Sequence, residues 1–170
     1  MDCHRFYNIA GKLRAKYATS DPFELCRCMG INLRYADIGS LKGMYKYIKK
    51  NYFILINNAL DSHTARIVCC HELCHHILHR DIVRNMGIWD NMLYDMSGSV
   101  EQEANVLSAE LMISDDDMQS EAFEGSTASQ VAAALGTDVH LVMLKAMSMR
   151  QRGYKLNCVF DVKADYLGEL

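Results

Sequence analysis

The sequence has no run of 18 apolar residues, and its first residues, MDCHRFYNIAGKLRAKY, lack an apolar signal core and a small-residue cleavage site. We therefore expect neither a membrane-spanning helix nor a secretory signal. The seven cysteines are odd in number, and two of them are adjacent. Together with the missing export signal, this pattern predicts free thiols in a reducing cytoplasm rather than a disulfide framework.

Repeats and low-complexity linkers are also missing, and the composition favours one domain over residues 1–170. Half of the residues are apolar, which excludes a chain that is disordered as a whole. The length suffices for one hydrophobic core. The net charge is only -3, but residues 1–50 are mainly basic and residues 81–124 mainly acidic. Solvated faces of opposite sign explain this asymmetry more simply than a charged partner does.

Local signals predict an α+β fold with a small sheet. The only proline, Pro22, suits the first turn of a short helix that Asp21 can cap and Gly30 can end. Other helices are expected over residues 3–17, 61–79 and 100–113 (Ser99 as cap, Gln102 completing a capping box), after Ser114, and over two segments within 126–152. Strands are expected in residues 31–38, 43–50 (an edge) and 51–58 (buried), and NCVFDV is a further candidate.

The two helices within residues 126–152 have the spacing of a helix-turn-helix. The second one begins TDVHLVMLKAM, which offers few groups that could contact bases or phosphates. Packing against the core is therefore the favoured interpretation, and direct DNA binding is not expected.

One stretch, VCCHELCHHILHRD, holds four of the seven histidines and contains a metal-binding spacing. His71 and His75 frame an H-E-x-x-H pattern, and residues four apart on a helix project from one face. Two neutral imidazoles so placed can share one zinc ion, while Glu72, rotated by about 100°, can contact a water molecule beside it. The alternative is a helix with packed or exposed histidines, but burying these groups unpaired in an apolar helix would be costly.

The third ligand must come from elsewhere in the chain. His79 is excluded, because eight helical residues separate it from His71 by about 12 Å. The three-histidine extension of the motif would need histidine in place of Asp81, so that class is excluded too. A glutamate from a later helix is the other common solution.

The helix expected over residues 100–113 offers, in order of preference, Glu103, Glu110 and Glu101. Glu103 falls on the apolar stripe that should face the core, where a carboxylate needs a cationic partner. Glu110 shares that face two turns later, and Glu101 falls on the opposite side.

These segments resemble the ImmA/IrrE family of metallo-endopeptidases. The resemblance rests on YFILIN, HELCHHILH and EQEANVLSAELMIS and covers about residues 5–150. It implies a zincin-like α+β domain, in which a small, mostly antiparallel three-stranded sheet packs on a helical core carrying the H-E-x-x-H helix, followed by C-terminal helices. Residues 1–60 would form the first helices and the sheet, residues 61–113 the zinc-site helices, and residues 114–170 the C-terminal helices and tail. Leu107, Ser114 and Cys74 depart from the residues usual in the family, which are phenylalanine, proline and glycine.

The resemblance also implies one zinc ion bound by His71, His75 and Glu103, with Glu72 as the catalytic carboxylate. The expected reaction is peptide hydrolysis by an activated water molecule, with Glu72 as general base. The implied substrate is a helix-turn-helix repressor of a phage or mobile element. His79 and Tyr94 are candidates for oxyanion stabilisation. The alternatives are a zinc-stabilised module that binds the repressor without hydrolysis, which would not need Glu72, and a toxin–antitoxin component.

Overall fold

The computed structural model describes residues 1–86, 98–122 and 125–156 and confirms the α+β class. Its elements are α1 (Cys3–Tyr17), α2 (Pro22–Cys28), β1 (Asn32–Ala36), β2 (Gly43–Ile48), β3 (Asn51–Asn57), α3 (Ser62–Met86), α4 (Gly98–Met112), α5 (Asp115–Glu121), α6 (Ala128–Leu135) and α7 (Val139–Gln151). The chain divides into two compact units: a sheet unit of residues 13–104 and a helical unit of residues 1–12 and 105–170. Tyr94 and NCVFDV lie outside the described residues, and the expectation of one domain over residues 1–170 stays a prediction.

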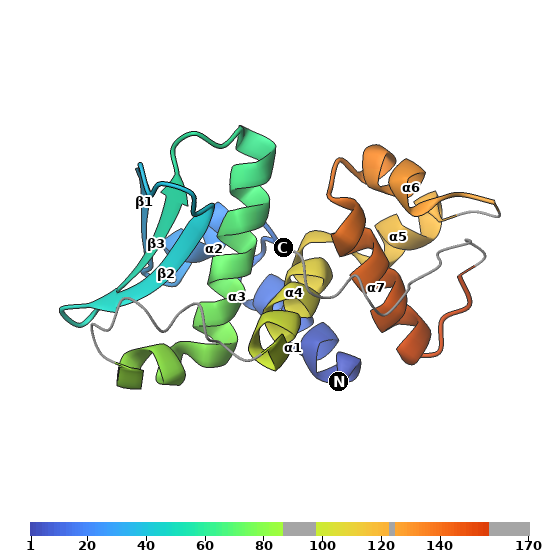
Figure 1. Cartoon of the computed structure of the whole chain (residues 1–170). Coiled ribbons are helices and arrows are strands. Elements are labelled where there is room, and N and C mark those ends of the chain that lie inside the picture. Colours follow the sequence, from blue (N-terminus) through green and yellow to red (C-terminus); the bar gives the residue numbers. More distant parts are fainter. Residues whose placement is uncertain (87–97, 123–124, 157–170) are drawn as a thin grey trace. The chain divides into compact units, whose positions relative to one another are not determined.

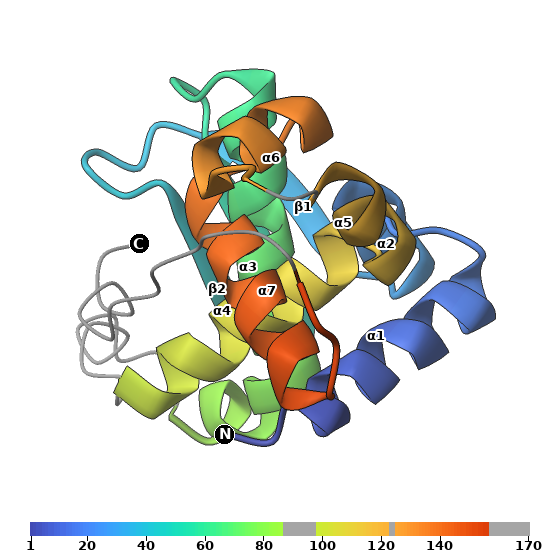
Figure 2. The same cartoon turned by 90° about the vertical axis from the view of Figure 1, so that its right-hand side faces the viewer.

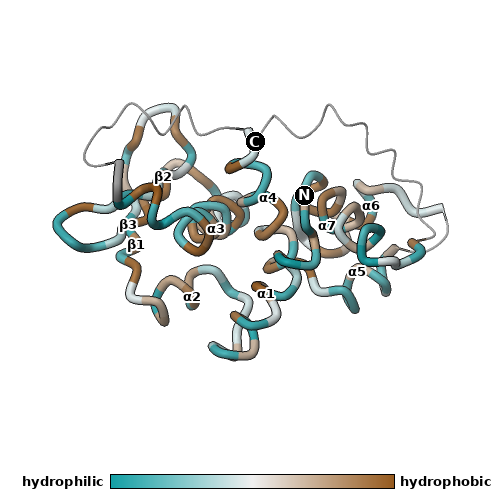
Figure 3. The backbone as a smooth tube through the Cα atoms, turned by 90° about the horizontal axis from the view of Figure 1, so that it is seen from below, coloured by the Kyte–Doolittle hydropathy of each residue, from teal (hydrophilic) through white to brown (hydrophobic). Residues whose placement is uncertain are grey.

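The sheet of the sheet unit is small and mixed. β3 is its central strand; it pairs in parallel with β1 and antiparallel with β2. The strand order confirms the predicted edge strand β2. Ile54 and Ile56 of β3 are fully buried and Phe53 and Leu55 only partly, so the predicted burial of this strand is confirmed for one face. The turn from β2 to β3 contains Lys49 and Lys50 at positive φ, and Figure 3 shows it as a hydrophilic tip.

The long helix α3 packs on β2 and β3, and α2 packs on both α3 and β1 (Figure 1). Asp21 caps α2 as predicted, accepting hydrogen bonds from the main-chain amides of Phe23 and Glu24 at 2.9 Å and 3.0 Å. Asp61 caps α3 in the same way, through the amides of His63 and Thr64. These caps satisfy amides that have no partner within the helix. They set where α3 begins and hence which residues pack on the sheet.

In the helical unit, α5, α6 and α7 pack on one another (Figure 2). Ser114 caps α5 as predicted, and Thr127 forms a capping box with Gln130 at the start of α6. Gly136 ends α6 at φ 56°, a conformation that glycine adopts without strain. One predicted cap is wrong: α4 already includes Gly98, so Ser99 lies inside the helix rather than before it.

Across residues 1–86, 98–122 and 125–156, no single helix combines the length and the apolar composition that crossing a membrane requires. Within these residues, α6 and α7 taken together meet both criteria, as a pair bent by 107°.

Candidate metal centre

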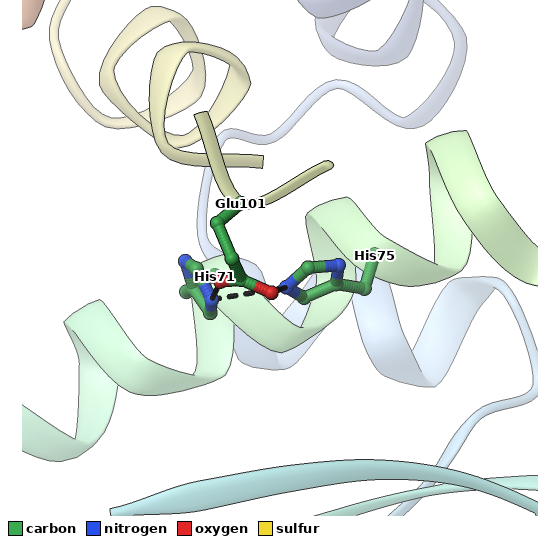
Figure 4. Close-up of side chains that lie close together, drawn as sticks. All are labelled: His71, His75 and Glu101. Carbon is green, nitrogen blue, oxygen red and sulfur yellow. Dashed lines mark hydrogen bonds and ion pairs between the residues drawn. The ribbon is translucent and has the colours of Figure 1, made fainter. Parts of the chain in front are cut away.

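The middle of α3 brings two imidazole nitrogens together. His71 Nε2 and His75 Nε2 lie 3.0 Å apart, as the spacing of four residues predicts. Glu101, from the first turn of α4, reaches both: its carboxylate oxygens lie 3.2 Å from His71 Nε2 and 3.4 Å from His75 Nε2 (Figure 4). Among the described residues, these three side chains form a group that could hold a metal ion.

The distances within this group fit a zinc site. Two ligand atoms about 2.05 Å from a tetrahedral zinc ion lie about 3.3 Å apart. The nitrogen–nitrogen and nitrogen–oxygen distances of 3.0, 3.2 and 3.4 Å bracket that value. Two imidazoles and one carboxylate also form a common ligand set for catalytic zinc, with one position left for water.

The local electrostatics favour the protonation states that metal binding requires. Hydrogen bonds from His71 and then His75 hold the pKa of Glu101 well below its usual range. Burial lowers the pKa of His75, and Glu101 offsets this only in part. A carboxylate and a neutral imidazole are the forms that bind metal, and a bound metal would replace the Nε2 protons of these hydrogen bonds.

Glu103, the predicted third ligand, does not lie with His71 and His75. Its Oε2 is 3.3 Å from His79 Nε2, and Glu101 takes the predicted position instead. Glu103 would face the histidines if α4 buried only the apolar stripe that contains it. In the structure residues 104–111 are all buried, so the apolar residues mark no single face and cannot orient the first turn.

Glu110, the second choice, is engaged in the helical unit. It accepts hydrogen bonds from Lys145 Nζ at 2.7 Å and from the Ser148 hydroxyl. A buried carboxylate needs a cationic partner, and for Glu110 the ammonium group of Lys145 serves as that partner in place of a metal.

Glu72 lies on α3 beside the histidine pair and close to the edge strand β2. Burial raises its pKa to about 7, while the main-chain amide of Tyr45 donates a hydrogen bond to it. The close approach depends on Gly43: a Cβ there would lie 3.0 Å from Glu72 Oε1 and would clash with Val68. No local sequence signal predicts this contact of Gly43, because a glycine at the start of a strand also fits a turn.

His76, His79 and the three cysteines of α3 are buried. His76 Nδ1 lies 2.8 Å from the buried hydroxyl of Tyr45, so His76 is a packed residue with a hydrogen-bond partner. Cys69, Cys70 and Cys74 are fully buried. Burial of this kind indicates that these cysteines pack in the core.

The fold and these residues define a small α+β protein with a candidate histidine–histidine–glutamate metal centre. The comparison with known families is more specific: residues 26–143 match the family described as the IrrE N-terminal-like domain, Peptidase_M78. The chain belongs to this family, which suggests a metallopeptidase and confirms the resemblance found in the sequence. It is also similar to the "Uncharacterized immunity region protein 2" of Bacillus phage phi105, with 31% identity over 138 residues, or 81% of this chain and 86% of the relative.

Proposed function

We propose that this protein is a zinc-dependent endopeptidase whose metal is bound by His71, His75 and Glu101. The observation that carries the proposal is the convergence of these three donor groups beside Glu72, a carboxylate that a structural metal site does not need. The third ligand thus differs from the predicted Glu103. When bound, zinc would polarise a peptide carbonyl and make water acidic near neutral pH.

Glu72 is the proposed general base and acid. Its burial beside the metal ligands and its pKa of about 7 suit a group that takes a proton and later gives it back. It would remove a proton from the attacking water and deliver it to the amine that leaves. The hydrogen bond from the Tyr45 amide holds the carboxylate in place against β2.

The edge strand β2 is the proposed binding surface for an extended substrate. On one side β2 pairs with β3, and the carbonyl of Lys42, just before it, accepts a hydrogen bond from Asn57 of β3. Alternation along an antiparallel pair then directs the main-chain groups of Gly43, Tyr45 and Tyr47 away from β3. A peptide added on that side would pass next to Glu72, because the Tyr45 amide contacts this carboxylate.

The proposed substrate is a helix-turn-helix repressor of a phage or mobile element. Support comes from the relative, whose name places it in the immunity region of a phage. The test is co-expression of this protein with the repressor encoded by the adjacent gene, followed by detection of repressor fragments. Wild type should give fragments, and Glu72→Gln should reduce their formation by about 10²–10⁴-fold, the usual contribution of a general base.

A matched control makes this test specific. Glu24→Gln changes an exposed glutamate of α2 that pairs with Arg27, and it should leave cleavage unchanged. Fragments that form equally with wild type and Glu72→Gln would rule out the mechanism. Loss of repression with both forms and no fragments would instead identify a module that binds the repressor without hydrolysis.

A further inference from the structure

A third histidine follows the candidate ligands on the same face of α3. His79 lies one turn after His75 and is 5% exposed. Its Nδ1 is 3.3 Å from His75 Nδ1, and its Nε2 is 3.3 Å from Glu103 Oε2. The three side chains therefore form a continuous series of hydrogen bonds, called here the hydrogen-bond chain. It begins at Nδ1 of His75, the ring nitrogen that is not directed at His71.

The proton positions in this chain follow from metal binding. His75 directs Nε2 at the other ligands, so Nε2 must carry no proton when it binds a metal, and the proton of the neutral ring lies on Nδ1. Nδ1–H can then donate to Nδ1 of His79, which leaves the proton of His79 on Nε2. That N–H donates to the carboxylate of Glu103, so every donor has an acceptor and no proton is added or lost.

We propose that His79 and Glu103 are positioning residues that fix the tautomer and the ring orientation of His75 for metal binding. The proposal rests on the proposed metal site, since it concerns one of its ligands. In metal centres, the second nitrogen of a histidine ligand almost always donates to such a partner, which orients the ring and raises its basicity. His79, which helical rise excludes as a ligand, and Glu103, which lies away from His71, would then both support the ligand His75.

The reverse direction of the same chain would act against metal binding. If His79 donated from Nδ1 to His75 Nδ1, the proton of His75 would have to lie on Nε2, where a metal must bind. Glu103 favours the productive direction, because its carboxylate accepts only from a protonated Nε2 of His79. Tautomer selection is thus a specific consequence of placing a carboxylate at the far end.

The experiment compares zinc affinity, measured by competition with a chromogenic chelator, in the full chain and its variants. His79→Leu removes the acceptor and the donor at similar size, and it should weaken zinc binding by about 10–100-fold. His79→Gln supplies a carbonyl acceptor and an amide donor, so it should keep the affinity within a few-fold of wild type. His63→Leu, an exposed histidine of the same helix, is the matched control and should change nothing.

The partner residue gives a second, independent measurement. Glu103→Leu should weaken zinc binding in the same direction, and its effect should not add to that of His79→Leu, because both act through one chain. Should His79→Leu prevent folding, as judged by circular dichroism of the metal-free protein, the comparison of Glu103→Gln with Glu103→Leu replaces it. In zinc-bound wild type, ¹⁵N spectra of the histidines should show the proton of His75 on Nδ1.

The outcomes separate this inference from the proposed function. Stoichiometric zinc binding by wild type with unchanged affinity in both His79→Leu and Glu103→Leu would overturn the positioning role and leave the metal site standing. Additive losses in the double variant, or a His75 proton on Nε2 in the zinc-bound form, would also overturn it. Wild type that binds no zinc, or Glu101→Gln that binds as tightly as wild type, would instead refute the proposed ligand set.

Discussion

Replacing Lys145 by methionine should destabilise the protein by about 3–5 kcal/mol, the cost of removing one partner from a buried ion pair. Lys145 Nζ lies 2.7 Å from Glu110 Oε2 and 2.6 Å from Asp115 Oδ1, and the side chains of Lys145 and Glu110 are both 0% exposed. Methionine keeps the apolar stem of the lysine but leaves the Glu110 carboxylate without its ammonium partner. Arg152 still pairs with Asp115 at 2.7 Å and 2.8 Å and lies farther from Glu110, with Nη2 3.5 Å from Oε1, so Glu110 should lose the most.

The effects of Lys145→Met and Glu110→Gln on stability should also depend on each other. Glu110→Gln alone should cost about 1–3 kcal/mol, because Lys145 keeps Asp115 and an amide can still accept from Ser148. In the Glu110→Gln background, Lys145→Met no longer removes the ammonium partner of a buried carboxylate. The double variant should therefore lose less than the sum of the single losses, by about 0.5–3 kcal/mol.

The assay is urea and thermal unfolding of the metal-free protein, followed by circular dichroism. A chain of this length loses about 2–4 °C in Tm per kcal/mol, so Lys145→Met should lower the Tm by about 6–20 °C. Lys155→Met, at an exposed lysine, should change stability by less than about 0.5 kcal/mol. A loss below about 1 kcal/mol for Lys145→Met, or strictly additive losses, would refute the argument that the pair is buried and coupled. The Glu110→Gln variant should still bind one zinc ion per chain, because Glu110 contacts Lys145 and Ser148 and not the candidate metal ligands.

Two further predictions concern a glycine and a carboxylate. Gly43→Ala should lower the free energy of unfolding in urea by about 1–3 kcal/mol and reduce cleavage, because the new methyl group meets Val68 and Glu72. Gly11→Ala is the control, since open space surrounds Gly11, and it should not destabilise the protein. Equal effects of the two variants would contradict the close approach of β2 to α3. For Asp115, burial raises the pKa but hydrogen bonds from its arginine and lysine partners outweigh this and lower it, so the carboxylate stabilises the fold above the ordinary aspartate pKa of about 4 and less at lower pH. The stability gap between wild type and Asp115→Asn should thus narrow as the pH falls from neutral to below about 4, and a gap that stays constant would contradict the linkage.

Features encoded by neighbouring residues were predictable from the sequence. Asp21, Ser114 and Gly136 mark helix ends through contacts within one turn, so their signals need no knowledge of the rest of the chain. The continuous apolar run in β3 identifies the central strand for a similar reason, although only the face of Ile54 and Ile56 is fully buried, while Phe53 and Leu55 are partly exposed. The H-E-x-x-H pair also lies within one turn, and its histidines meet as predicted.

Features that depend on how distant elements meet, whether strands or helices, were not predictable in the same way. The order β1-β3-β2 makes one strand pairing parallel, which the expectation of a mostly antiparallel sheet did not anticipate. The choice between Glu101 and Glu103 depends on the direction in which α4 approaches α3, and the periodicity of α4 carries no such information. The helical spacing of Glu101 and Glu103 places them on opposite sides of α4, but it does not identify which side faces the histidines.

The contacts of these two glutamates show why both can serve one centre. Glu101 contacts His71 and His75, whereas Glu103 contacts His79, so their targets lie about 9 Å apart along α3 at 1.5 Å per residue. Two residues of α4 advance by only about 3 Å, which cannot span that distance. Residues two apart do project about 200° from each other, so the two side chains leave α4 in opposite directions and reach different histidines. Acidic residues at i and i+2 of one helix can therefore supply a metal ligand with one carboxylate and support a histidine ligand with the other.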